Sequence, residues 1–158
     1  MSRPAPKPMR DSQTIMTELM MPNATNFAGS IFGGNILALA DKVAYVCSVK
    51  HAGTTTVTAS VDRVNFKHPI HVGQLVTCYA NVNLAGKTSM EVGIMIEAKD
   101  IHTREITTTN SCYFTMVAVD DQGNKVAVPE AIPESAEEIK WHEKAKIRRA
   151  VRLREIFG

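Results

Sequence analysis

The sequence predicts an α+β fold in which an antiparallel sheet wraps around one long central helix and a second helix ends the chain. Three features predict this arrangement. A long apolar stretch of helical length comes early, four strand-like segments with short connections follow it, and a charged helical segment comes last. Because no helix separates these successive strands, a doubly wound parallel sheet is disfavoured.

Size and composition bound the class of protein. The 158 residues suit one domain with a real core, and 44% hydrophobic and 22% charged residues are ordinary for a soluble globular chain. The net charge of +2 is too small to imply a polyanionic partner. Apolar runs stay far below the roughly 20 residues that span a bilayer, and residues 1–10 do not resemble a secretory signal. We expect a cytoplasmic protein that binds neither nucleic acid nor a membrane.

The first elements follow from local composition. Residues 1–12 contain three prolines and are expected to form a flexible N-terminal tail. Residues 13–20 mix β-branched residues with methionine and predict a first strand. The long helix is expected to begin near Gly34 and to run to His51, because Gly53 stands where helices commonly end.

Four further strands are expected after this helix. The first is dense in threonine and valine, and the third alternates apolar and polar residues with a period of two. With the helix and the first strand, they make one domain over residues 13–130. Because the helix is apolar almost all round, we expect the sheet to cover it on several sides. The expected strands are residues 54–66, 75–84, 90–97 and 105–119.

The last segment, residues 131–158, is predicted to carry a basic C-terminal helix. Its first turn is acidic, which suits the positive end of the helix dipole. From Lys140 to Arg154 there are seven lysines and arginines against one glutamate. Such a one-signed run suits a phosphate-bearing ligand or the acidic face of a partner, although a solvated surface would explain it too.

One carboxylate interrupts the apolar stretch of residues 36–47. Burying Asp41 unpaired would be costly, so we expect a raised pKa, a partner or a function. Gly34 lies seven residues earlier, and on a helix these two positions fall within about 20° of each other. A buried acid on the same face as a glycine-lined helix start is suited to polarising a carbonyl and attacking it. A purely structural, capped carboxylate is the alternative.

The cysteines and histidines suggest no metal site. Cys47, Cys78 and Cys112 lie far apart in apolar or alternating segments, and no pair has the spacing of metal ligands. We expect reduced, buried thiols. None of the five histidines has a partner at metal-ligand spacing either.

Several blocks of the sequence resemble the acyl-CoA thioesterases of the cytosolic acyl-CoA hydrolase family. The resemblance covers roughly residues 14–129 and implies the hot-dog fold. It implies hydrolysis of fatty acyl-CoA to free fatty acid and CoA, so CoA is part of the substrate and product and no separate cofactor is needed. The matching blocks are residues 21–34, 41–44, 57–66, 69–73, 86–91 and 113–119.

The resemblance also implies site residues. It matches Asn26 and Asp41 to the two catalytic positions, which face each other across a subunit interface in the family. Asp41 would act as general base on a water or attack the thioester directly. Asn26 would orient the water or hold the thioester, and the amide of Gly34 would stabilise the oxyanion. The expected assembly is a dimer or a trimer of dimers.

Contacts with CoA are implied for two strand segments and for the basic helix. A residue of that helix, Arg148 or Arg149, is expected to pair with a CoA phosphate. The strand residues that carry over from the family are Ala59, Ser60, Val61, Thr88, Ser89 and Met90.

Other functions stay open at this level. The same fold can bind or sense acyl-CoA without cleaving it, and a hydratase is a weaker possibility because it would need a histidine near the helix start. Asn26 alone would suit a turn, and paired glycines alone can serve close packing. The acyl chain length that the protein prefers does not follow from the sequence.

Overall fold

The computed structural model describes residues 2–157. Short 3-10 helices at Met9–Ser12 and Pro22–Ala24 accompany the main elements. In chain order these are β1 (Lys7–Pro8), β2 (Thr14–Leu19), α1 (Gly33–Ala52), β3 (Thr56–Val61), β4 (Leu75–Ala85), β5 (Ser89–Lys99), β6 (Ile106–Ala118), β7 (Ala131–Ile132) and α2 (Ala136–Phe157).

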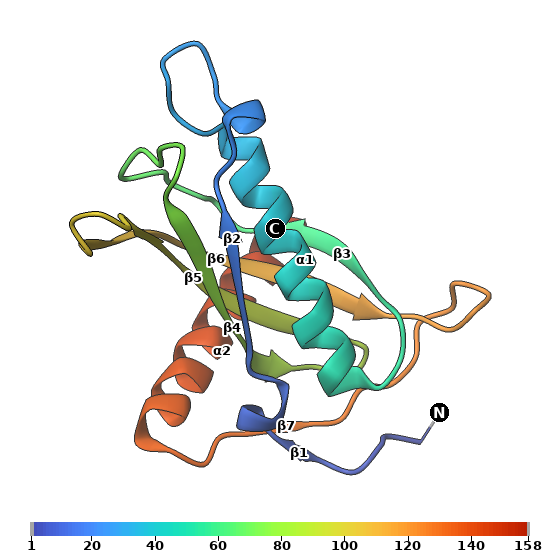
Figure 1. Ribbon diagram of the computed structural model, residues 1–158. Coiled ribbons are helices and arrows are strands. Elements are labelled where there is room, and N and C mark those ends of the chain that lie inside the picture. Colours follow the sequence, from blue (N-terminus) through green and yellow to red (C-terminus); the bar gives the residue numbers. More distant parts are fainter. Residues whose placement is uncertain (1, 158) are drawn as a thin grey trace.

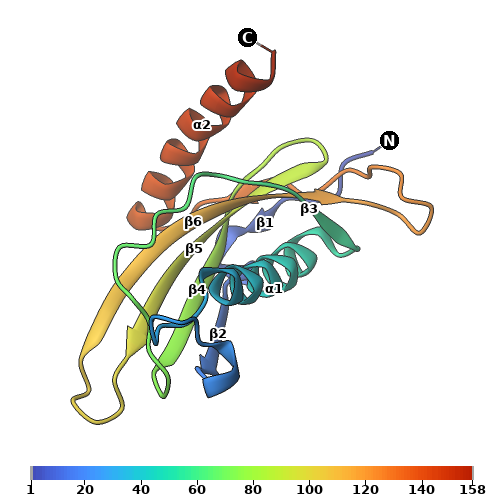
Figure 2. The ribbon, with the colours of Figure 1, turned by 90° about the horizontal axis from the view of Figure 1, so that it is seen from above.

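The described residues form a five-stranded antiparallel sheet in the order β2-β4-β5-β6-β3. Helix α1 lies along one face of this sheet, and α2 lies on the opposite face (Figure 1, Figure 2). We call the side of α1 the inner face and the side of α2 the outer face. The predicted order of a strand, a long helix, four strands and a final helix is confirmed.

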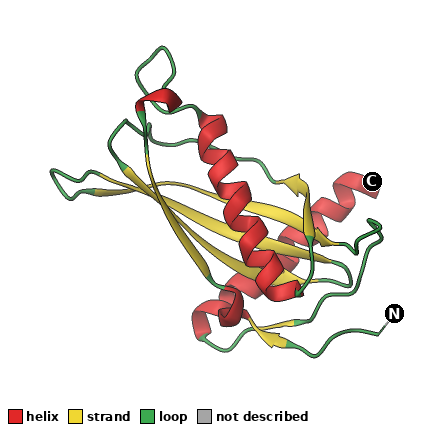
Figure 3. Cartoon of the chain, turned by 45° about the vertical axis from the view of Figure 1, so that its right-hand side comes forward, coloured by secondary structure: helices red, strands yellow, loops and turns green. Residues whose placement is uncertain are grey.

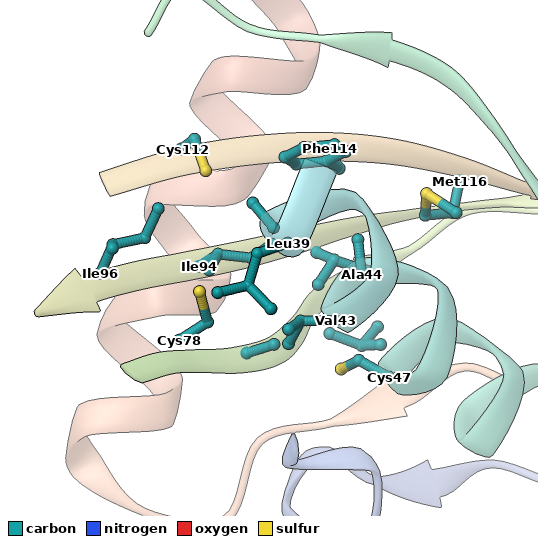
Figure 4. Close-up of a cluster of buried hydrophobic side chains, with 14 of the residues drawn as sticks. Leu39, Val43, Ala44, Cys47, Cys78, Ile94, Ile96, Cys112, Phe114 and Met116 are labelled. Carbon is teal, nitrogen blue, oxygen red and sulfur yellow. The ribbon is translucent and has the colours of Figure 1, made fainter. Parts of the chain in front are cut away.

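The core fills the space between α1 and the inner face. The buried residues of α1 recur at intervals of three and four, which places them on one stripe of the helix. Leu39 from this stripe lies beside Ile94 of the sheet (Figure 4), and Val43, one turn later, is buried as well. The full stripe consists of Ile36, Leu39, Ala40, Val43, Ala44, Cys47, Ser48 and His51.

This stripe corrects two expectations. The sheet covers α1 along one side in this chain, not on several sides, so Lys42 and Tyr45 are exposed. Asp41 was expected to be buried, and it is exposed as well. The reason is the phase of the helix, because Asp41 follows the buried Ala40 and has turned away from the sheet.

The ends of α1 lie close to where the sequence placed them. Gly53 stands at the C-terminal end with a positive φ of 72°, and its N–H donates to the carbonyl of Val49 at 2.8 Å. Glycine adopts this left-handed conformation without steric cost. The helix begins at Gly33, one residue before the expected start.

The N-terminal segment differs from the expected flexible tail. Strand β1 pairs in parallel with β7, and the side chain of Met9 is buried in the core. Further toward the N-terminus, Nε of Arg3 donates to the carbonyl of Val128 at 2.9 Å. The apolar side chain of Met9, the pairing of β1 with β7 and the side-chain hydrogen bond of Arg3 hold the segment against residues that are distant in the sequence.

Strand β3 is shorter than expected and contains a bulge. It ends at Val61, whereas the sequence suggested a strand to residue 66. Its pairing with β6 shifts at Ala59, so that Thr58 lies opposite Met116 and Ser60 lies opposite Thr115. Side chains two apart on a regular strand share one face, but a bulge breaks this alternation.

The bulge places the side chains of Thr58 and Ser60, which are two residues apart on β3, on opposite faces of the sheet. Met116 is buried on the inner face, and Oγ1 of Thr58 lies 3.5 Å from its sulfur. Thr115 belongs to the outward set of β6, so Ser60 faces outward as well. As the last strand of the sheet, β3 has one free edge, and it lies near α1 (Figure 3). One edge strand thus contributes to both faces.

No helix within residues 2–157 has the combination of length and apolar character that crossing a bilayer requires.

Candidate active site

Asp41 is held by a threonine from the edge strand. Oγ1 of Thr58 donates a short hydrogen bond of 2.5 Å to Oδ1 of Asp41. Both residues are exposed in this chain. Thr58 orders the carboxylate through one oxygen, and among residues 2–157 the other oxygen has no hydrogen-bond partner. Sequence reasoning missed Thr58, because the richness of residues 54–61 in threonine and valine indicates a strand but not which hydroxyl meets the helix.

The start of α1 offers uncapped amides. Phe32 stands at the N-cap and has no side-chain oxygen to accept from the first N–H groups. Gly34 is exposed, and a Cβ built there would meet nothing within 4 Å. The partial positive charge of the helix N-terminus therefore faces an open approach at this residue.

The lack of a side chain at the neighbouring Gly33 is explained by packing. A Cβ at Gly33 would lie 3.2 Å from the ring of Phe66, so the absence of a side chain lets this ring pack against the helix start. Gly34 and Asp41 are seven residues apart on the same helix, as predicted, which is about 10 Å along its axis. Helical side chains lean toward the N-terminus, which brings the carboxylate closer to the amides.

Asn26 lies in the loop before α1 and is fixed by a local turn. Its Oδ1 accepts from the N–H groups of Ala28 at 2.9 Å and Ser30 at 3.1 Å. Within residues 2–157 no hydrogen bond joins Asn26 to Asp41, and the side-chain NH₂ of Asn26 has no partner. The loop projects beyond the N-terminal end of α1 (Figure 1). Phe27, which follows Asn26 in this loop, is fully exposed.

The residues expected to contact CoA are partly brought together on the outer face. Ser60, Ser89, Met90 and Arg149 line a cleft of about 150 Å³, which we call the outer cleft. Its wall on the side of α2 also contains Leu153 and Ile156.

The other strand residues lie elsewhere. Thr88 is in the turn before β5, where its carbonyl accepts from the N–H of Ala118 at 2.9 Å. Ala59 is the bulge residue, and Val61 lies opposite Phe114 of the inner face. A larger hollow of about 440 Å³ also opens on the outer face near Tyr79 and Trp141, but in the described part of the chain no predicted site residue lines it.

The two candidate arginines have different surroundings. Arg148 binds the buried Glu91 through two hydrogen bonds, and its guanidinium lies 3.7 Å from the ring centre of Tyr113. Burial disfavours the charge of Arg148, but the hydrogen bonds and the attraction of Glu91 outweigh it and raise the pKa of this guanidinium. Arg149 forms no ion pair with the described residues and lines the outer cleft.

The three cysteines are buried and unpaired, as expected. Burial raises the pKa of Cys47 to about 11 and the pKa values of Cys78 and Cys112 to about 12. The thiolate is the reactive form of cysteine, and these groups stay protonated at neutral pH. They therefore belong to the packing of the core.

Comparison with known proteins gives the class of this protein. Residues 28–105 match the family model of the thioesterase superfamily. Protein VdlD of Helicobacter pylori is 48% identical over 143 residues, which cover 90% of this chain and 82% of that protein.

Solved structures place the chain in the same class of proteins. An apo-hexameric acyl-CoA thioesterase is 38% identical, with a TM-score of 0.92 over 96% of this chain and 97% of that chain. An acyl-CoA hydrolase from Staphylococcus aureus, solved with butyryl-CoA and CoA, is 34% identical, with a TM-score of 0.84 over 94% and 93%. The molecule is a hot-dog thioesterase, as its sheet, central helix and uncapped helix start suggested. The chain belongs to the acyl-CoA thioesterase family.

Three further structures of the Staphylococcus aureus protein carry alanine in place of an asparagine, an aspartate and a threonine. They are 33% identical to this chain, with TM-scores from 0.80 to 0.86 and at least 94% of both chains covered. Those three positions are separated by 15 and 17 residues, which are the separations of Asn26, Asp41 and Thr58 here.

Proposed function

We propose that this protein hydrolyses fatty acyl-CoA thioesters to free fatty acid and CoA, with Asp41 as the reacting carboxylate. The observation that carries the proposal is the geometry of Asp41. Its carboxylate is exposed, Thr58 holds one oxygen at 2.5 Å, and the open amide of Gly34 lies in the first turn of the same helix. The solved relatives named acyl-CoA thioesterases and hydrolases support the choice of substrate.

In the first route Asp41 acts as a general base and takes a proton from water while the water oxygen bonds to the thioester carbon. The negative charge that develops on the carbonyl oxygen is stabilised by the amide of Gly34 at the positive end of α1. The intermediate then expels the CoA sulfur as a thiolate, which takes up a proton. A thiol has a pKa of about 8.5, so this leaving group departs without help from a strong acid.

Direct attack by Asp41 is the second route to the same products. The carboxylate would displace CoA thiolate and form a mixed anhydride, which water then hydrolyses to the fatty acid and a free carboxylate. In both routes Thr58 is a positioning residue, because its hydroxyl holds one oxygen of Asp41 and leaves the other for the reaction.

The complete site is proposed to need a second subunit. Asn26 would reach Asp41 of a neighbouring chain, where its free NH₂ group orients water or holds the thioester carbonyl. The projecting loop, the exposed ring of Phe27 and the free edge of β3 with exposed Val57 and Val61 support this assignment. Dimers with adjoining sheets, assembled further into a trimer of dimers, fit these surfaces, and relatives described as hexameric support the same assembly.

The CoA moiety is proposed to cross the edge strand β3, with its thioester near Asp41 and its phosphates in the outer cleft. Arg149 is the phosphate ligand, while Ser60 and Ser89 supply hydroxyls to the chain between them. The backbone of Ala59, Val61, Thr88 and Met90 borders that path. The unpaired thiols favour a cytoplasmic protein.

The deciding experiment measures release of free CoA with a thiol reagent, across acyl chain lengths, for the wild-type protein and for Asp41→Asn. Loss of the base should lower kcat by about 10²–10⁴, because general-base catalysis contributes that much. Folding should be unaffected, since Asp41 is exposed. Asp121→Asn, at an exposed turn, is the matched control.

Two outcomes would contradict the proposal. If the wild-type protein binds acyl-CoA tightly in calorimetry without releasing CoA, it is a binding or sensing protein. If Asp41→Asn keeps full turnover, hydrolysis stands but Asp41 is not its reacting group.

A further inference from the structure

The second half of α2 is attached to the outer face by charged side chains. Within the described part of α2, the buried residues are Glu138 and Ala145, both nearer the helix start. Beyond them, Arg148 and Arg152 lie one turn apart on one side of the helix, and both reach Glu91 of β5. The placement of this half of α2 therefore depends on ion pairs.

Glu91 is buried, with 1% of its side chain exposed, and both of its oxygens are engaged. Nη2 of Arg148 donates to Oε1 at 2.6 Å, and Nε of the same residue donates to Oε2 at 3.1 Å. Nη2 of Arg152 adds a bond of 2.9 Å to Oε2, and its Nη1 donates to Asp62 at 2.8 Å. Two cations thus meet two carboxylates, which leaves the cluster electrically balanced.

Such a cluster fixes geometry more than it adds stability. Well-packed apolar residues often replace a buried ion pair at no cost, so its presence is weak evidence for a stabilising role. The planar fork of Arg148 on a carboxylate, with the ring of Tyr113 beneath it, allows few orientations. The cluster therefore sets both the rotation and the register of α2 on the sheet.

Rotation and register decide where Arg149 lies. This residue follows Arg148 and is turned from it by about 100° around the helix. It faces the outer cleft, where a Cβ added at Gly86 would come within 3.0 Å of its Nη2. Within residues 2–157 it forms no ion pair, so its charge is free for an anion.

We infer that Glu91, with Asp62, is a positioning residue for substrate recognition: by binding Arg148 and Arg152 it orients α2 so that Arg149 meets the phosphates of CoA. The inference rests on the proposed function and deepens it by assigning the residues that set affinity for the nucleotide half of the substrate. The Ala59 bulge contributes to the same cluster. It turns Ser60 outward to the cleft, and just beyond it Asp62 donates its N–H to the carbonyl of Tyr113.

The test compares two thioesters with the same acyl chain. Acyl-CoA carries the nucleotide and its phosphates, whereas acyl-pantetheine carries neither. Glu91→Gln should raise KM for acyl-CoA by about tenfold, as expected for the loss of one charge-assisted contact, with kcat unchanged. The same variant should leave kcat/KM for acyl-pantetheine within about twofold of wild type.

Two further variants sharpen the result. Arg149→Ala should show the same selective rise in KM, and combining it with Glu91→Gln should add little, because both changes remove the same phosphate contact. Glu143→Gln is the matched control, since Glu143 pairs with Lys146 on the exposed side of α2. It should leave KM for acyl-CoA unchanged.

Failure of this inference and failure of the proposed function would give different results. Equal losses for both thioesters in Glu91→Gln would show a merely structural role, and an unchanged KM for acyl-CoA would show no role in recognition. If Glu91→Gln does not fold, Asp62→Asn carries the test, because Asp62 is partly exposed. If the wild-type protein hydrolyses neither thioester, the proposed function fails, and calorimetry with CoA against pantetheine still decides whether Glu91 governs phosphate binding.

Discussion

The two faces of the sheet hold their helices through different interactions. On the inner face, α1 is attached by a stripe of apolar side chains such as Leu39 and Val43, each 3% exposed or less. On the outer face, the second half of α2 is attached through Glu91 and its two arginines. Apolar packing holds a helix firmly but tolerates small rotations, whereas a guanidinium fork sets orientation. Helix α1 therefore supplies a rigid support, and α2 supplies an oriented charge.

The residues proposed for catalysis differ from Glu91 in burial. Asp41, Thr58 and Gly34 are exposed at the margin of the inner face, so substituting them removes little buried surface. A buried leucine or valine contributes about 1.5–3 kcal/mol to folding. Asp41, Thr58 and Gly34 are not part of the buried core, so their substitution does not remove a contribution of this kind. Glu91 is buried, so its substitution affects folding as well. Changes on the inner side should appear in kcat, and changes on the outer side in KM.

The largest effect is expected from mixing two inactive variants. Asn26→Ala and Asp41→Asn should each lose most activity alone. If the two residues meet across an interface, subunit exchange in a one-to-one mixture should restore about a quarter of wild-type activity, because each composite site draws its two residues from different chains.

The measurement is CoA release before and after the variants are unfolded and refolded together. A mixture of Asp41→Asn with wild type serves as the control for dilution. Activity that stays at the level of the single variants would place Asn26 and Asp41 in the same chain, or would remove Asn26 from the reaction.

A smaller effect is expected at Thr58, which lies on the edge strand that contributes to both faces. Thr58→Val keeps the shape of the side chain and removes the hydroxyl that holds Asp41. A hydrogen bond to a charged group contributes about 1.5–3 kcal/mol, so kcat should fall by about tenfold to a hundredfold. KM should stay constant, since the outer cleft is untouched.

Steady-state kinetics on acyl-CoA checks this prediction. Thr58→Ser, which restores the hydroxyl, should recover most of the lost turnover. A rise in KM without a fall in kcat would place Thr58 in binding and would weaken the division between the two faces.

The elements of the fold could be predicted because their signals are local. Gly53 marks the end of α1, and alternation marks β5, in each case within a few neighbouring residues. The exposure of Asp41 was not predictable in this way. An apolar helix has the same sequence pattern whether its own sheet or another chain covers it, so the pattern suggested burial where this chain leaves the carboxylate open.

The site was predictable where the resemblance named residues, and less so where distant segments meet. Arg148 and Arg149 are adjacent and identical in type, and the phase of α2 against Glu91 separates their surroundings. Met9 was assigned to a flexible tail because its local sequence is rich in proline and basic residues. Its burial depends on the packing of the short helix Met9–Ser12 against α1 and β4, which no local pattern shows.

The smallest effect is expected at the helix start, where stability and activity should move in opposite directions. Gly34→Ala adds a Cβ that meets nothing within 4 Å, so folding carries no steric cost. Alanine within a helix is favoured over glycine by about 0.5–1 kcal/mol, which should raise the Tm by about 1–4 °C. The same methyl group narrows the approach to the amide, so kcat/KM should fall severalfold.

Gly33→Ala is the paired measurement, because its Cβ would lie 3.2 Å from the half-exposed ring of Phe66, which can move. Thermal unfolding and kinetics of both variants test whether the thioester approaches the amide of Gly34. A stabilised Gly34→Ala variant with full activity would show that the thioester does not approach this amide. The oxyanion would then have to be held elsewhere, and Asn26 of the neighbouring chain would become its principal donor, which moves the electrostatic part of catalysis from the helix to the interface.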